Sequence, residues 1–139
     1  MNGFPFSCPV EVRFADVDAM HHVNNAVTVS YLEVARVKLW RDRFGLRGGA
    51  AEFPFVVARI EVDYRRPIEL GDAVEVGVAV SHVGRTSFTF AYRVEAGGLL
   101  AAEAASVQVA YDYERRTPMP VPEALRRLLD SIAAPARGA

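Results

Sequence analysis

Apolar and polar side chains alternate along most of the chain, which is typical of strands that bury one face. The alternation predicts five strands, at 10–15, 58–64, 74–80, 88–94 and 107–111. In the last strand we expect Val107, Val109 and Tyr111 to continue the apolar face, with a bulge or an exposed end near Glu103. The last four strands are joined by short turns, and Gly97-Gly98 is a hairpin signal, so we expect antiparallel pairing.

The pattern changes between residues 26 and 44, where no Gly or Pro interrupts the chain. Asn24 or Asn25 is a suitable N-cap for a helix, and Gly45 supplies a C-cap. Apolar residues cover more than one stripe of this helix, which predicts that other elements surround it. A short amphipathic helix begins at Pro122, and we expect a mobile tail from Ala133. The pattern therefore predicts an α+β fold in which an antiparallel sheet wraps around one long central helix.

Length and composition narrow the possible functions. The 139 residues are enough for a single domain, 1–139, and show neither a repeat nor a linker. The net charge of -1 leaves no basic excess for a nucleic-acid backbone. Cys8 is the only cysteine, which excludes an intramolecular disulfide and a cysteine-rich zinc site. We find neither a secretion signal nor a membrane-spanning run, and we expect a cytoplasmic protein.

Polar side chains gather between the first predicted strand and the long helix. Within ten residues lie Asp16, Asp18, His21, His22, Asn24 and Asn25. Titratable groups at such a junction are candidates for a site. The same residues also suit a solvated loop with Asx turns and an N-cap, which is the better interpretation on spacing alone. The spacing matches no recognisable set of metal ligands, so we predict no metal.

The order of several short motifs adds to this interpretation. The run Asp16-Val17-Asp18-Ala19-Met20-His21-His22-Val23-Asn24-Asn25-Ala26, followed by Tyr31-Leu32-Glu33-Val34-Ala35-Arg36, resembles the hotdog-fold acyl-CoA thioesterases of the 4-hydroxybenzoyl-CoA thioesterase type, especially their long-chain acyl-CoA branch. Further matches follow in order at 63–67, Gly71-Asp72, 84–88 and Ala102-Glu103. The resemblance extends over about residues 8–125 and implies the hotdog fold, with a core at about 8–132.

The resemblance implies roles for the loop residues. In that family the carboxylate at the position of Asp18 acts as nucleophile or as general base for water. The backbone N–H of Asn25, at the helix N-terminus, is by analogy the oxyanion donor. Asp16 is expected to fix the loop by hydrogen bonds, and His22 either orients the loop, polarises a water or satisfies a backbone carbonyl. His21 and Met20 depart from the family pattern.

Other residues are expected to bind substrate. Arg65, Arg66 and Arg85 are candidates for the coenzyme A phosphates, because guanidinium binds phosphate well, although exposed arginines at strand ends are common. The remaining predicted substrate-binding residues are Asn24, Thr86 and Ser87. Glu33 and Arg36 share one face of the helix, and we interpret them as a buried or interfacial ion pair.

The resemblance also implies an activity and an assembly. We expect an acyl-CoA thioesterase that releases a carboxylic acid and free coenzyme A, acting on coenzyme A or acyl-carrier-protein thioesters without a separate cofactor. The acyl chain would lie against apolar residues of the helix and sheet at a subunit interface of a homodimer or homotetramer. The alternatives are a hotdog hydratase or dehydratase, disfavoured because no Pro lies between Asp18 and His22, and a non-enzymatic acyl-CoA-binding module.

Overall fold

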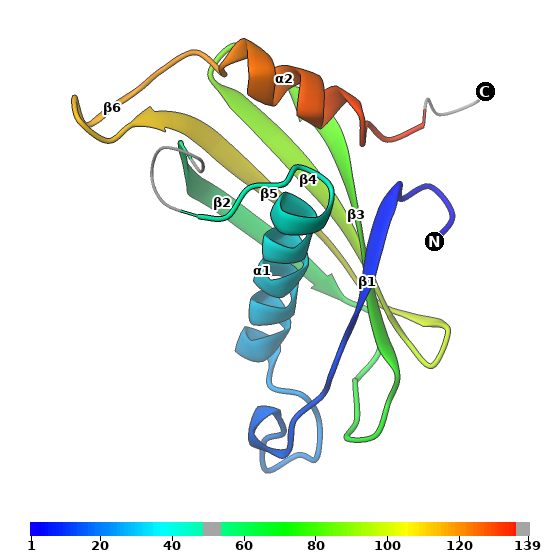
Figure 1. Ribbon diagram of the computed structural model, residues 1–139. Coiled ribbons are helices and arrows are strands. Elements are labelled where there is room, and N and C mark those ends of the chain that lie inside the picture. The colour runs from blue at the N-terminus through cyan, green and yellow to red at the C-terminus, as the bar shows by residue number, and fades with distance from the viewer. Residues whose placement is uncertain (49–53, 136–139) are drawn as a thin grey trace.

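The computed structural model describes residues 1–48 and 54–135 and has one antiparallel sheet curled around a long helix (Figure 1). The elements are β1 (Phe6–Val10), a short 3-10 helix η1 (Phe14–Asp16), α1 (Asn25–Asp42), β2 (Phe55–Tyr64), β3 (Val74–Val83), β4 (Ser87–Ala96), β5 (Leu99–Asp112), β6 (Thr117–Pro118) and α2 (Glu123–Asp130). The strand order is β1-β3-β4-β5-β2, and β6 pairs with the end of β5. The predicted α+β architecture is confirmed.

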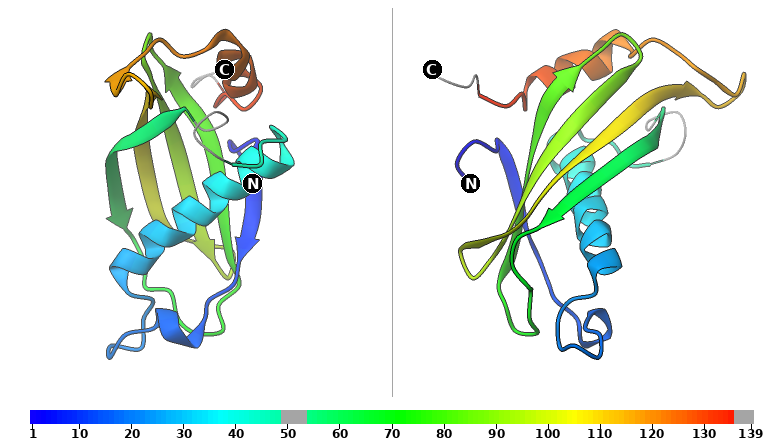
Figure 2. Two further views of the ribbon diagram at one scale, coloured as in Figure 1. Left: turned by 60° about the vertical axis from the view of Figure 1, so that its left-hand side comes forward. Right: turned by 180° about the vertical axis from the view of Figure 1, so that it is seen from behind.

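Helix α1 lies against the concave face of the sheet, as Figure 2 shows from two sides. Its buried residues recur at helical spacing and include Leu32, Leu39 and Trp40. The Trp40 ring meets Phe88 and Phe90 of β4 at centroid distances of 6.4 and 5.9 Å. Val37, by contrast, is 43% exposed, so α1 is covered on one side and not all round. The central helix is thus confirmed, while its full enclosure is not.

The first strand lies earlier than the alternation at 10–15 predicts. Phe6, Cys8 and Val10 point into the core from β1, and pairing with β3 ends at Val10. Hydrogen bonds between Arg13 and Asp16 then turn the chain into η1, which leaves Phe14 exposed. The prediction of a strand at 10–15 is therefore wrong, because side-chain hydrogen bonds override the apolar alternation there.

Strand β5 buries the face that the sequence pattern assigns to solvent. The residues that face α1 are buried, and they are Ala102, Ala104, Ser106, Gln108 and Ala110. Val107, Val109 and Tyr111 lie on the opposite face and are half-buried. The prediction for this strand is thus wrong by one residue in phase, because Ser106 and Gln108 satisfy their polar groups inside the core.

The turn before β5 agrees with prediction. Gly97 and Gly98 both have positive φ, of 59° and 79°, as a two-residue hairpin turn requires. Pairing between β4 and β5 shifts register around Ala101, two residues before Glu103, and Glu103 itself is exposed. The bulge or exposed end expected near Glu103 is therefore confirmed.

The C-terminal segment still contacts the sheet at Ala133 and Ala134, where a mobile tail was predicted. Helix α2 begins at Glu123 with Pro122 as its N-cap, and it buries Leu125 and Leu129. Ala134 N–H then donates to the Val80 carbonyl at 2.8 Å, so the tail expected to be mobile from Ala133 is paired with β3 there. Residues 136–139 of that prediction lie outside the described residues. No helix within the described residues is long and apolar enough to cross a membrane.

Candidate active site

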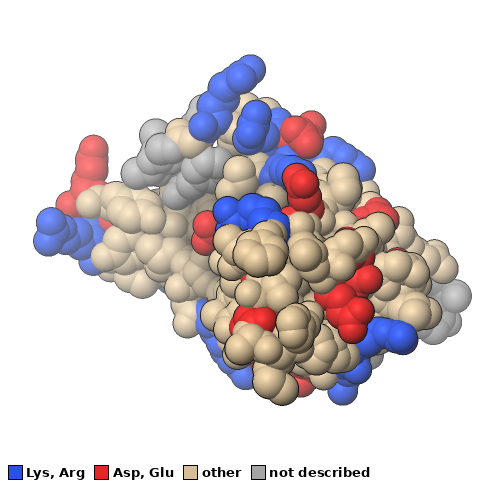
Figure 3. Space-filling view, turned by 90° about the horizontal axis from the view of Figure 1, so that it is seen from below, with Lys and Arg blue, Asp and Glu red and all other residues tan. Residues whose placement is uncertain are grey.

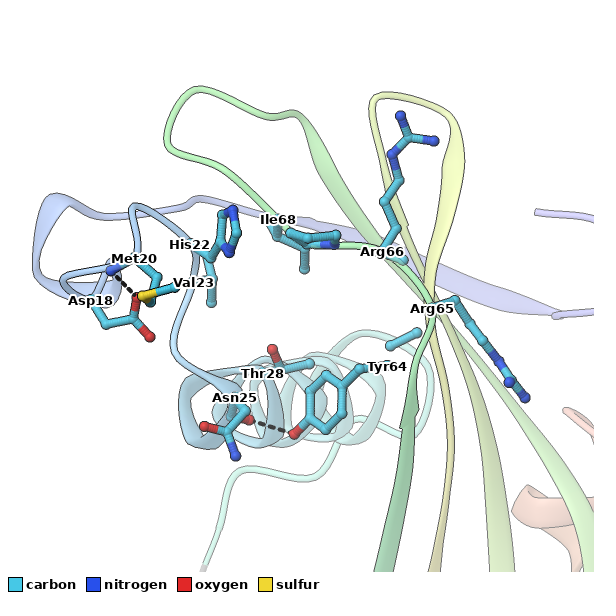
Figure 4. A pocket seen from close by; sticks show the side chains of 13 residues that line it. Asp18, Met20, His22, Val23, Asn25, Thr28, Tyr64, Arg65, Arg66 and Ile68 are labelled. Atoms are coloured by element: carbon cyan, nitrogen blue, oxygen red, sulfur yellow. Dashed lines mark hydrogen bonds between the residues drawn. The ribbon is translucent and has the colours of Figure 1, made fainter.

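A pocket of about 360 Å³ opens at the N-terminus of α1 (Figure 4). The loop before α1 forms one wall through Asp18 and His22, and the first turn of α1 contributes Asn25. The end of β2 forms the opposite wall with Tyr64 and Arg65. Three separate elements therefore converge here, and they bring Asp18, His22 and Asn25 together as predicted.

The Asp18 loop is a tight hairpin. Asp18 N–H donates to the His22 carbonyl at 3.0 Å, and His21 N–H donates to the Asp18 carbonyl at 2.9 Å. His21 adopts a φ of 65°, which a non-glycine residue takes mainly in such turns. The Asp18 carboxylate accepts only the Met20 N–H, at 2.9 Å, from the described residues. One carboxylate oxygen and part of the other remain free to accept a further hydrogen bond.

Asp16 is held quite differently, two residues away. Its buried carboxylate accepts from the backbone N–H, Nε and Nη2 of Arg13 at 2.9, 3.1 and 2.8 Å, and from the Tyr31 hydroxyl at 2.7 Å. Burial alone would raise the pKa of the Asp16 carboxyl, but these hydrogen bonds and the Arg13 charge outweigh burial and lower it. Burial and the hydrogen bond to Asp16 raise the pKa of the Tyr31 hydroxyl. Asp16 therefore fixes the loop to α1, in the way predicted.

The start of α1 leaves one backbone donor available. The Asn24 side chain caps the helix by accepting from Ala26 N–H at 2.9 Å. The Asn24 carbonyl accepts from Val27 and Thr28 N–H at 2.9 and 3.2 Å. No described residue accepts from the Asn25 N–H, which lies at the positive end of the helix dipole. A negatively charged oxygen in the pocket would find its donor here.

Tyr64 is a site residue that sequence reasoning missed. Its hydroxyl donates to the Asn25 carbonyl at 2.6 Å, and its ring forms part of the pocket wall (Figure 4). The bond ties the end of β2 to the first residue of α1 and so fixes the direction of the Asn25 peptide groups. The sequence places Tyr64 just before Arg65-Arg66-Pro67, which is the one indication that Tyr64 belongs to the site. Only the fold shows that β2 ends beside α1.

The other predicted residues divide between the pocket and elsewhere. The His22 ring lines the pocket near Ile68, and its backbone pairs with Glu69 (Figure 4). Arg65 and Arg66 extend in different directions from the strand end. Arg65 forms an ion pair with Glu103, with 3.2 Å between Nε and Oε2. No ion pair joins Arg66 to a described residue.

Arg85, Thr86 and Ser87 lie at the opposite end of the sheet. Arg85 and Thr86 belong to the turn between β3 and β4, and Ser87 begins β4; the turn lies beside α2, where the Val121 N–H donates to the Arg85 carbonyl. Strand β4 separates this turn from the end that holds the pocket, and its ten residues span roughly 33 Å. A substrate in the pocket of one chain would not contact these three residues of that chain, and their role in substrate binding stays a prediction.

The surroundings of the pocket carry mixed charge. Seen from the end of the sheet that holds the Asp18 loop, acidic and basic side chains are interspersed, and neither sign covers the face (Figure 3). Within the described ranges, no group of three or more His, Cys, Asp or Glu side chains is placed to hold a metal ion. The groups available for chemistry around this cavity are therefore an accessible carboxylate, an imidazole and a helix N-terminus.

Comparisons with known proteins identify similar sequences and structures. Residues 12–129 match the family model of the thioesterase-like superfamily. The acyl-CoA thioester hydrolase YbgC of Escherichia coli is 32% identical over 128 residues, which cover 90% of this chain and 96% of that protein. A 1,4-dihydroxy-2-naphthoyl-CoA hydrolase of Synechococcus elongatus is 28% identical, covering 88% and 93%. A thioesterase of Thermus thermophilus, solved with coenzyme A and zinc, superposes with a TM-score of 0.86 at 43% identity, covering 95% and 96%.

Proposed function

Since this chain belongs to the thioesterase-like superfamily, we propose that it hydrolyses acyl-CoA thioesters to a carboxylic acid and free coenzyme A, with Asp18 as nucleophile or general base. One observation carries the proposal: the accessible Asp18 carboxylate and the unbonded Asn25 N–H line the same pocket. Relatives named as thioester hydrolases support this reaction over hydration of an enoyl thioester.

The proposed reaction forms a tetrahedral intermediate and then breaks it down. The Asp18 carboxylate either attacks the thioester carbonyl or removes a proton from the water that attacks it. The carbonyl oxygen becomes an oxyanion, and the Asn25 N–H donates to it at the helix N-terminus. Collapse of the tetrahedral intermediate breaks the C–S bond and releases the coenzyme A thiolate, which takes a proton from Asp18 where Asp18 acted as general base and from water otherwise. If Asp18 is the nucleophile, water then hydrolyses the mixed anhydride and restores the carboxylate.

Incubation of the purified protein with a panel of acyl-CoA thioesters tests the activity by the release of free thiol. We expect thiol release with at least one saturated acyl-CoA. Loss of the conjugated absorbance of an enoyl-CoA without thiol release would instead identify a hydratase. Binding of acyl-CoA without turnover would identify a binding module.

Turnover in water enriched in heavy oxygen tests whether Asp18 is the nucleophile. Attack of water on the Asp18 side of a mixed anhydride leaves the label in the Asp18 carboxylate, and mass spectrometry of the peptide detects it. A general base leaves Asp18 unlabelled and places the label in the carboxylic acid product, as does attack of water on the acyl side of the anhydride, so a labelled Asp18 is the decisive result.

Strand β2 supports assembly of two copies through its free edge. It lies at one end of the strand order, and its α1-facing side chains Val57, Ile60 and Tyr64 are exposed. An apolar strand edge of this kind is usually covered in a native protein. We therefore propose a homodimer joined along β2. Sedimentation of the active enzyme measures its oligomeric state, and a fully active monomer would contradict the proposed homodimer.

A further inference from the structure

A second pocket, of about 230 Å³, lies farther along α1, between its C-terminal half and the start of β2. Its walls are mostly apolar and contain one buried arginine; they are Glu33, Arg36, Val37, Trp40, Phe55 and Val57. The roles proposed for the Asp18 loop do not use this pocket. A buried cation in an apolar wall calls for a physical explanation, because arginine is seldom buried without an anionic partner.

The charge of Arg36 is only weakly compensated within the chain. The residue is 6% exposed, and its Nη1 donates to the Tyr92 hydroxyl at 3.1 Å. The carboxylate nearest to it in the described chain is Glu33, whose Oε2 lies 4.0 Å from Nη2 and whose side chain is 73% exposed. Glu33 and Arg36 thus form the predicted pair, but only the arginine is buried. The Nε and the second Nη group have no hydrogen-bond acceptor among the described residues.

A chain of hydrogen bonds fixes the Arg36 head group from the other side. Gln108 Nε2 donates to the backbone carbonyls of Phe88 and Ser106, so its Oε1 is left to accept from the Ser106 hydroxyl. The Ser106 oxygen then accepts from Tyr92, and the Tyr92 oxygen accepts from Arg36. Each hydroxyl proton therefore points away from Arg36. This series of hydrogen bonds orients the Arg36 cation without supplying a negative charge.

The two pockets lie along one apolar strip. Because β2 pairs with the buried residues of β5, its α1-facing side chains are Phe55, Val57, Ile60, Val62 and Tyr64, in order from the second pocket to the first. The Cα atoms of Asn25 and Arg36 are eleven residues apart on α1, roughly 16 Å along its axis. Side chains on a helix lean toward its N-terminus, which brings the guanidinium closer to the first pocket.

We infer that Arg36 is the recognition group for the far end of the acyl chain, and that it binds a carboxylate there. The acyl groups favoured are ω-carboxyacyl chains, that is, monothioesters of dicarboxylic acids. The inference rests on the proposed function, because the thioester end must lie beside Asp18 and Asn25. A carboxylate in the second pocket would accept from Nε and Nη2 of Arg36 and supply the missing negative charge.

Kinetics with matched substrates test this inference. Each ω-carboxyacyl-CoA, from succinyl to hexadecanedioyl, is compared with the methyl-terminated acyl-CoA of the same chain length. At one length or more we expect the wild-type kcat/KM to be higher for the carboxylate-terminated chain. Arg36→Met keeps the apolar stem and removes the cation, and it should lower this preference about tenfold or more. Arg127→Met, which removes an exposed arginine of α2, is the control and should leave the preference unchanged.

Glu33→Gln tests the same site without touching the buried network. Removing the exposed carboxylate beside Arg36 should raise the preference for carboxylate-terminated chains, because that carboxylate repels the ligand. If Arg36→Met does not fold, the direction of change in Glu33→Gln decides. An unchanged ratio in Glu33→Gln and in any folded Arg36→Met would overturn the inference, while hydrolysis itself would still support the proposed function.

A binding measurement decides the inference even without turnover. Trp40 is the only tryptophan and lines the second pocket, so its fluorescence reports occupancy. Dodecanedioate should bind at least about tenfold more tightly than dodecanoate, and Arg36→Met should abolish the difference. Equal affinities for the two acids would contradict the inference. Failure of every acyl-CoA to release thiol would contradict the proposed function instead.

Discussion

Asp16 and Asp18 belong to one short loop, and the structure treats their carboxylates in opposite ways. Asp16 is buried and accepts four hydrogen bonds from Arg13 and Tyr31. Asp18 is half-buried, accepts a single backbone N–H and lines the pocket. The sequence contains the same residue type twice within three positions, so residue type alone does not separate a structural carboxylate from a reactive one.

The difference lies in unused hydrogen-bonding capacity. A carboxylate that already accepts several strong hydrogen bonds is stabilised as an anion, and it is a weak base because its pKa is lowered. A carboxylate with free lone pairs beside a cavity can approach a water or a thioester carbonyl. The loop thus uses Asp16 to fix its shape and leaves Asp18 for chemistry, a division that the following variants test.

Asp18→Asn should have the largest effect. It keeps the size of the side chain and removes the anion, so kcat should fall by roughly 10² or more, as is typical when acid–base function is lost. KM and the melting temperature should change little, because the side chain makes one hydrogen bond to the described residues. Thiol release on the best substrate, measured beside a thermal melt, checks both. A near-normal kcat would show that Asp18 is not the reactive group.

Asp16→Asn should act on stability instead. It removes the charge that Arg13 and Tyr31 are bonded to, and the free energy of unfolding should fall by about 1–3 kcal/mol. Because the Arg13 side chain is 72% exposed, its ion pair contributes the smaller share. Denaturant unfolding measures the change, and kcat of the folded fraction should fall less than in Asp18→Asn. If both variants lowered only stability, the division between the two residues would be wrong.

The stability difference at Asp16 should depend on pH. The folded state lowers the pKa of this carboxyl, so the wild type gains stability from it at pH values above the unfolded pKa of about 3.9. As the pH falls through the lower, folded-state pKa, that contribution is lost. The wild type and Asp16→Asn should therefore differ fully at pH 7 and converge in strong acid. A constant difference across denaturant titrations at several pH values would show that the charge of Asp16 is not the cause.

Tyr31→Phe should have the smallest effect of the set. It removes one of the four hydrogen bonds to Asp16 and leaves the Arg13 contacts, so the expected loss is about 0.5–1.5 kcal/mol. In an Asp16→Asn background the loss should shrink, because the two side chains are in contact. A double-mutant cycle in denaturant measures this coupling. Independent, additive losses would mean that the Tyr31 hydroxyl supports something other than Asp16.

The sequence predicted those parts of the molecule in which local pattern and burial agree. Helix α1 followed from an uninterrupted apolar segment, and the β4–β5 hairpin followed from Gly97-Gly98. The pairing of Asp18 with the helix N-terminus followed from the family resemblance and from their closeness in the chain. These features depend on residues near one another in sequence.

Two of the errors, the inverted face of β5 and the missed Tyr64, have a common physical cause in polar contacts between residues far apart in the sequence. Ser106 is buried with the Tyr92 hydroxyl of β4 as a partner, and Gln108 is buried because the Phe88 carbonyl of β4 and the Ser106 hydroxyl and carbonyl satisfy its amide. Tyr64 reaches Asn25 across 39 positions of sequence, and nothing local indicates that contact. Polar residues look solvent-exposed in a sequence until the partner that satisfies them is known, which is why the face of β5 was inverted.

The C-terminal segment closes a gap in the sheet that β1 leaves open. Strand β1 covers β3 only from Val74 to Val78, and beyond it Val80 donates to the Ile132 carbonyl and accepts from the Ala134 N–H. A chain clipped after Asp130 by a protease would expose both backbone groups of Val80 in an apolar strand. Such an opening invites a strand from another molecule. Removal of the segment that follows α2 should therefore promote aggregation, which light scattering of the clipped chain would measure.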